Sequence, residues 1–129
     1  MNKYEIDPSA YSDGRLQDND IVLFRYADVL LMKAEAKVRN GENGTAELNE
    51  VRHRAGMPLR VKATLDNILK ERLLELMWEG LRRNDLVRYG LFTKAYDFKP
   101  ATGSYTSVFP IPSQAINKDG NLKQNKGYD

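Results

Sequence analysis

The chain has 129 residues, and 20 Lys and Arg against 18 Asp and Glu leave a formal net charge of +2. This length allows one ordinary domain, and so even a balance gives no electrostatic argument for nucleic-acid or anionic-membrane binding. The absence of cysteine excludes disulfides, cysteine nucleophiles and thiolate metal centres. The single histidine, His53, excludes a multi-histidine metal site within this chain. No uninterrupted apolar run exceeds four residues, so we expect no membrane-spanning segment.

Residues 1–20 are polar and contain Pro8 and Gly14, which predicts an extended lead-in. Asp20 is placed to cap a helix that begins near Ile21. We expect residues 21–129 to form a single all-α region.

The segment 21–40 has the strongest helical pattern in the chain. At 100° per residue, one arc of about 120° collects seven apolar side chains: Leu23, Phe24, Ala27, Leu30, Leu31, Ala34 and Val38. A second, narrower stripe is formed by Val22, Val29 and Ala36. We therefore expect this helix to pack on two sides, with its small alanines allowing a close approach.

A Gly/Asn turn at 41–44 separates this helix from a shorter one that is predicted to start at a Thr45 cap and to run through Arg54. Two antiparallel helices joined by so tight a turn form an αα-hairpin. Such a hairpin is one unit of a tetratricopeptide-like array, although one unit does not establish a repeat.

The third helix is predicted over residues 64–79, with Gly80 ending it and a further helical turn or two over 81–89. Helical phase places the charged Arg72 and Glu79 on the apolar side of this helix. Because buried charges persist when they are paired, we predict an internal ion network. Its proposed members are Glu71, Arg72, Glu75, Glu79, Arg82, Asp85 and Arg88.

Two other interpretations of these charges, and one of His53, were weighed. The i,i+4 spacing of Glu71, Glu75 and Glu79 also fits a carboxylate site for metal or glycosidic acid/base chemistry. The ion network is favoured because no second carboxylate pair stands at a defined spacing. The basic residues at 82–88 suggest nucleic-acid contacts, but interleaved acidic residues argue against them. His53 lacks an identifiable catalytic partner, so we expect a surface or turn-capping role.

After Asp97 the chain becomes rich in proline and glycine, which leaves room for one short helical turn near 113–117 and an extended stretch at 109–112. We expect this irregular tail to pack over the helices. Residues 117–121 look like an Asx-type turn, because they lack the alternating acidic ligands of a calcium loop. Exposed aromatic rings stack on sugar faces, and the candidates are Tyr4, Tyr11, Trp78, Tyr105 and Tyr128, although loop tyrosines usually anchor the loop.

Three blocks, taken in order, resemble the C-terminal region of the SusD/RagB family. The first is RYADVLLMKAEA at 25–36 followed by LNEVRHRAG at 48–56. The second is ERLLELMWEGLRRNDLVRYG at 71–90, and the third is FPIP at 109–112 with the ending NLKQNKGY at 121–128. Arg83 and Asn84 stand where the family often has an aromatic pair, and Lys126 stands where proline is usual.

This resemblance implies a non-enzymatic protein of Bacteroidetes-type bacteria, built on tetratricopeptide-like helix pairs. Members of the family are outer-membrane lipoproteins that face the outside, bind glycans or other nutrients and cover a TonB-dependent SusC-like transporter. Complete members are several times longer and begin with a lipoprotein signal. The resemblance therefore implies that this chain is a C-terminal portion, with the lipid anchor in the part before it. No matched motif is a ligand motif, so no ligand-binding, catalytic, cofactor or metal residue is assigned.

Three functional hypotheses follow. The favoured one is glycan or nutrient capture by a larger protein in which this chain supplies scaffold. The alternative is a free-standing helical-repeat module for protein–protein interaction. The third is a carboxylate hydrolase that uses Glu75 or Glu79.

Overall fold

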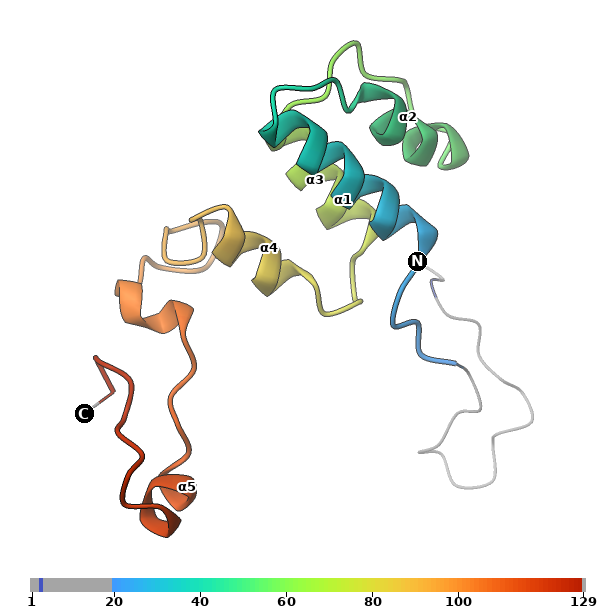
Figure 1. Cartoon of the computed structure of the whole chain (residues 1–129). Helices are drawn as coiled ribbons and strands as arrows, with labels where there is room; N and C mark the ends of the chain where they lie inside the picture. The colour runs from blue at the N-terminus through green and yellow to red at the C-terminus, as the bar shows by residue number, and fades with distance from the viewer. Residues whose placement is uncertain (1–2, 4–19, 129) are drawn as a thin grey trace. The chain divides into compact units, whose positions relative to one another are not determined.

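The computed structural model describes Lys3 and residues 20–128, which divide into one compact unit up to Glu75 and another from Leu76. The described residues contain helices and one isolated bridge between Tyr96 and Lys99, without a strand. The all-α class is therefore confirmed (Figure 1). The helices are α1 (Tyr26–Arg39), α2 (Thr45–Arg54) and α3 (Leu65–Glu75) in the first unit, and α4 (Arg82–Arg88), the 3-10 helix η1 (Ser104–Ser107) and α5 (Ser113–Lys118) in the second.

The first unit is a three-helix arrangement in which α1 contacts both α2 and α3 (Figure 1). The predicted αα-hairpin of α1 and α2 is confirmed. The predicted packing of the second stripe is wrong, because Val29 is 48% exposed and Ala36 is exposed as well, while α1 contacts both helices through the first arc. Its centre is apolar, because the side chains of Leu31, Leu48 and Ile68 are fully buried. Burying a side chain of this size contributes about 1.5–3 kcal/mol.

The α1–α2 turn depends on a close backbone approach. A Cβ atom added at Gly44 would lie 2.5 Å from the carbonyl oxygen of Ala34. Ala34 is itself completely buried, so neither backbone has room to retreat. Gly44 is the N-cap of α2, while Thr45 is the first helical residue and its Oγ1 accepts a hydrogen bond from the Ala63 N–H at 2.9 Å. The expected Thr45 cap is therefore wrong by one residue.

Helix α1 begins five residues later than the sequence predicts. Asp20 caps nothing, residues 21–25 are not helical, and Arg25 is the extended N-cap at φ −126°. The reason is tertiary, because the Arg25 side chain extends to Glu75 at the end of α3. As a consequence Leu23 and Phe24, predicted to be on the buried arc, are 80% and 84% exposed.

Helix α3 ends four residues before the predicted boundary. Thr64 starts it as a capping residue, since its Oγ1 accepts the Asn67 N–H while Asn67 Oδ1 accepts the Thr64 N–H. After Glu75 the chain turns, with Trp78 at φ +71°, a left-handed conformation that is rare for a bulky residue. Glu79 therefore does not lie on the face of α3, and its predicted helical phase is wrong.

The tail of the second unit is held by its own last residues. Gln124 accepts the Ile111 N–H and donates to the Ile111 carbonyl, at 2.8 and 2.9 Å. Asn125 donates to the Phe109 carbonyl, and the Tyr128 hydroxyl donates to the Val108 carbonyl. The extended stretch at 109–112 and the turn at α5 are confirmed, whereas η1 had no sequence signal. Apart from Lys3 and Asp20, the predicted lead-in lies outside the described residues.

No helix in the described part of the chain has the length and apolarity needed to cross a membrane.

The Gly44 contact gives a direct stability test. We predict that Gly44→Ala lowers the free energy of unfolding by about 1–3 kcal/mol, because the new methyl group overpacks two backbones. Gly120→Ala is the matched control, since a Cβ there meets no atom within 4 Å. Urea denaturation followed by circular dichroism measures both variants. Equal stability of the two variants would contradict the close approach.

Candidate functional site

Glu75, the last residue of α3, joins three segments of the first unit. Its Oε1 accepts a hydrogen bond from Arg25 Nη1 at 2.7 Å, and Arg54 Nη2 lies 2.6 Å from both carboxylate oxygens. Its main-chain oxygen also accepts from Arg25 Nη2 and from Lys3 Nζ, each at 2.8 Å. We call Glu75 with Arg25 and Arg54 the Glu75 clasp. It ties the start of α1 and the end of α2 to the end of α3.

Two further ion pairs link the helices in the interior. Arg72 Nη1 lies 2.7 Å from Asp28 Oδ1, which connects α3 to α1. Arg52 pairs with Glu71, which connects α3 to α2, and Arg52 Nε also donates to the Pro58 carbonyl. All four charged side chains are at most 9% exposed. Pairing of this kind is what makes burial of a charge tolerable.

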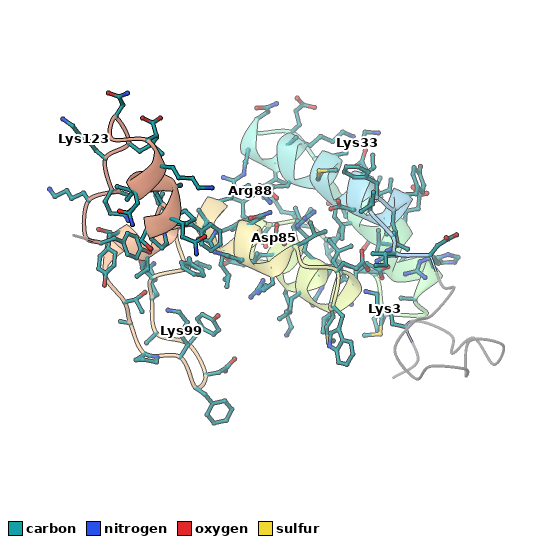
Figure 2. All side chains as sticks on the ribbon, turned by 90° about the horizontal axis from the view of Figure 1, so that it is seen from below. Lys3, Lys33, Asp85, Arg88, Lys99 and Lys123 are labelled. Carbon is teal, nitrogen blue, oxygen red and sulfur yellow. The ribbon has the colours of Figure 1, made fainter. Side chains whose placement is uncertain are left out.

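The seven residues assigned to an ion network lie in both units. Glu71, Arg72 and Glu75 are on α3, and they bind residues of α1, α2 and the segment before α1. In the second unit, Arg88 Nη2 lies 2.9 Å from Asp85 Oδ1, both on α4 (Figure 2). Glu79 and Arg82 lie in this unit too.

Sequence reasoning missed four partners, namely Arg25, Asp28, Arg52 and Arg54. Spacing along one helix identifies charges on that helix, but it does not indicate which residues of other helices face them. The available signal was the location of all four within the first block of the family resemblance.

A further charged contact links α1 to α2. Glu47 Oε1 lies 2.6 Å from Lys37 Nζ and 3.0 Å from Lys33 Nζ, and Lys33 projects from α1 (Figure 2). The hydrogen bond from Lys37, followed by that from Lys33, lowers the pKa of Glu47 to about 2. The same contact raises the pKa of Lys33 above its ordinary value.

A pocket of about 420 Å³ adjoins the Glu75 clasp. Apolar side chains from Ala27, Leu30 and Val51 line it together with the polar groups of α2 and the first residues of α1. The remaining lining residues are Arg25, Tyr26, Glu50, His53 and Arg54. The three aliphatic residues belong to the core and are at most 9% exposed, so the accessible lining is made mainly by the polar residues and Tyr26.

The carboxylate alternative finds little support in the geometry. Glu71 and Glu75 each face arginine, and the pocket lining contains one carboxylate, Glu50, where a glycosidase needs two. Among Lys3 and residues 20–128, no three His, Cys, Asp or Glu side chains are grouped closely enough to hold a metal ion.

The aromatic candidates have different environments. Tyr105 and Tyr128 pack edge to face with centroids 5.0 Å apart, and the hydroxyl of Tyr128 is bound, so this pair anchors the tail. Trp78 is 84% exposed. Tyr4 and Tyr11 lie outside the described residues. Tyr26, which lines the pocket and is 68% exposed, was not among the sequence candidates.

Two loop and surface predictions also have structural outcomes. Asn121 N–H donates to Asp119 Oδ1 at 3.0 Å, which confirms the Asx-type turn. Arg83, from the basic stretch, stacks over Phe109 at 3.8 Å and Phe92 at 4.9 Å, and it donates to the Ser107 carbonyl at 3.0 Å. This arginine therefore ties α4 to the tail.

Comparison with known families gives a match over nearly the whole chain. The model described as the SusD family matches residues 1–128. The chain belongs to the SusD family. It is 38% identical over 135 residues to the starch-binding protein SusD of Bacteroides thetaiotaomicron, a match that covers 97% of this chain and 24% of the relative. It is 41% identical over 145 residues to the SusD-like protein P38 of Formosa agariphila, covering 98% of this chain and 27% of that protein.

Solved structures agree in fold. Surface glycan-binding protein A from Bacteroides uniformis superposes with a TM-score of 0.75 at 31% identity, covering 84% of this chain and 28% of that one. NanU of B. fragilis gives 0.68 at 31% identity, covering 86% and 28%. The chain thus spans about a quarter of the length of the relatives that it matches. The all-α, tetratricopeptide-like fold of the SusD family is confirmed.

The low pKa of Glu47 predicts an acid-dependent loss of stability. An unfolded glutamate titrates near pH 4.3, so the contribution of Glu47 is fully present above that pH and is lost as the pH falls toward 2. We expect the difference in unfolding free energy between the wild type and Glu47→Gln to shrink between about pH 5 and 2.

Glu42→Gln provides the matched control, because Glu42 is exposed in the turn after α1. Its difference from the wild type should stay nearly constant across the same range in denaturant titrations. A difference for Glu47→Gln that is independent of pH would contradict the Lys37–Glu47 contact.

Proposed function

We propose that this chain is the C-terminal scaffold part of a protein that captures glycans or related nutrients without cleaving them. The observation that carries the proposal is the SusD-family match over residues 1–128, together with relatives named for starch binding and surface glycan binding. Capture would take place at the outer face of the outer membrane. It would serve a TonB-dependent SusC-like transporter, and a lipid anchor would lie in the part of the protein before this chain.

The contacts within the chain support the scaffold role. The sequence blocks that carry the family resemblance contain the residues that bind one another in the structure. Arg25 and Arg54 bind Glu75, while Arg72 binds Asp28. Hydrogen bonds between the ending at 121–128 and the backbone of residues 108–111 likewise join two of the family-like segments. These residues are thus occupied in holding the fold, which suits a scaffold better than a variable ligand surface.

The start of α1 supports a place inside a larger assembly. Six apolar side chains in or just before α1 are 44–84% exposed, namely Ile21, Leu23, Phe24, Tyr26, Val29 and Met32. An apolar surface of this extent is typical of one that another protein surface covers. The same exposed apolar residues argue against the second candidate function, a free-standing module for protein–protein interaction, because such a surface on an isolated chain promotes aggregation.

The test begins with the DNA upstream of Met1. We expect an in-frame continuation that encodes a lipoprotein signal with its cysteine. The protein from that whole reading frame should bind malto-oligosaccharides or another neutral glycan in calorimetry and release no new reducing ends. Failure of the whole protein to bind any nutrient glycan, or product release, would contradict the proposal. A reading frame that starts at Met1 and yields a monodisperse chain with a specific protein partner would favour the interaction module.

A further inference from the structure

We infer that the connection between α2 and α3 is a docking edge for an extended segment of another polypeptide, one that carries acidic side chains. Residues 57–63 of this connection are called the edge segment. This binding role is separate from glycan capture, and it depends on contacts that the proposed function does not use.

The edge segment runs back alongside α2 and is held there by side chains of that helix (Figure 1). Arg52 Nε donates a hydrogen bond to the Pro58 carbonyl at 2.8 Å. Asn49 is bonded twice to the backbone of Arg60, because it donates to the carbonyl and accepts from the N–H, each at 2.8 Å. The start of α2 holds the end of the segment through the hydrogen bond described above. Residues 57–60 are not helical and the chain bends at 61–62, so the segment is an extended stretch fixed to a helix.

The backbone of this segment has one occupied edge and one free edge. In an extended chain the N–H and C=O of one residue face one edge, and those of the next residue face the opposite edge. Because both groups of Arg60 face Asn49, the corresponding groups of Leu59 and Val61 face away from α2. Within the described part of the chain these groups of Leu59 and Val61 have no hydrogen-bond partner. Unpaired groups along one edge are what a partner strand binds in β-augmentation.

The side chains along the free edge are apolar and exposed. Leu59 is 59% exposed, Val61 is 101% exposed, and Met57 precedes them at 46%. Alternate side chains of an extended chain share a face, so these three form an apolar strip beside the free backbone groups. In strand addition the main chain supplies affinity and alternate side chains supply specificity. The edge segment offers both to an extended partner.

The charge of the edge segment selects an acidic partner. Arg60 and Lys62 alternate with the apolar residues and are exposed, and neither takes part in an ion pair among the described residues. The stretch from 51 to 65 contains no Asp or Glu. Complementary charge across an interface favours the right partner and excludes others.

A second copy of the same edge is the competing occupant. Lysine and proline often protect an edge strand from pairing. Pro58 does not block the free edge, because its carbonyl accepts from Arg52 on the side of α2. Arg60 and Lys62, however, would meet their own copies across a symmetric pair, and like charges placed opposite one another are destabilising. An acidic segment is therefore the better match than a second copy.

The experiment is an NMR titration of the ¹⁵N-labelled chain with a capped peptide of alternating valine and glutamate, about seven residues long, which is an ordinary strand length. We expect chemical-shift changes to concentrate at 57–62, and solvent exchange of the Leu59 and Val61 amide protons to slow. The same peptide with lysine in place of glutamate should bind at least about fivefold more weakly, because it brings like charges to Arg60 and Lys62.

A matched pair of variants separates the backbone from the side chain. Val61→Ala shortens the side chain and keeps the N–H, whereas Val61→Pro removes the N–H. Val61→Pro should therefore bind about fivefold more weakly than Val61→Ala, as expected for one lost hydrogen bond. Phe98→Ala, which removes a 104% exposed ring in the second unit, should bind like the wild type. Spectra of the free variants show whether each one is folded, and the lysine peptide decides the question if Val61→Pro does not fold.

The docking edge is contradicted if the glutamate peptide leaves the resonances of 57–62 unmoved, or if the lysine peptide binds equally well. It is also contradicted if Val61→Pro binds like Val61→Ala, because side chains alone then hold the peptide. Shifts at the same residues that grow with the concentration of the chain alone would make a second copy the occupant and overturn the proposal. None of these outcomes bears on glycan capture, which is decided by the binding of nutrient glycans to the protein from the whole reading frame.

Discussion

The first unit depends on arginine–carboxylate pairs that run between helices. Helix α3 carries Glu71, Arg72 and Glu75, and each of them binds a partner from another segment. A helix of 11 residues has little stability of its own. Apolar packing alone tolerates many relative placements of three short helices, whereas two buried ion pairs and the Glu75 clasp each join specific residues of different segments. The register of the helices therefore follows from these charges.

The sequence could predict the type of each main element but not those helix ends that are set by tertiary contacts. The sequence located α2 to within one residue and identified Arg72 as a charge on an apolar face. Periodicity placed the start of α1 too early, because the hydrogen bond between Arg25 and Glu75 joins residues 50 positions apart and leaves no local signal. It extended α3 through Glu79, because the left-handed turn at Trp78 has no signature in a sequence without glycine there. The partners of α3 and the pocket beside Tyr26 were equally out of reach, since both arise only when α1 and α2 are placed in space.

The residues that hold the chain together differ from those that remain available to a partner. The family-like blocks mainly make internal contacts. These are the ion pairs of the first unit and the hydrogen bonds of Gln124 and Tyr128 within the tail of the second.

The most direct measurement of the central claim is a double-mutant cycle on the buried pair of Asp28 and Arg72. Unfolding free energies of the wild type, Asp28→Asn, Arg72→Met and the double variant would be compared at one concentration of trimethylamine N-oxide that keeps all four folded. The account predicts that each single change costs about 3–5 kcal/mol, because it leaves a buried charge without its partner. It also predicts that the double variant is more stable than the sum of the single effects allows, by at least about 1 kcal/mol. Strictly additive losses would contradict the claim that this pair fixes α1 against α3.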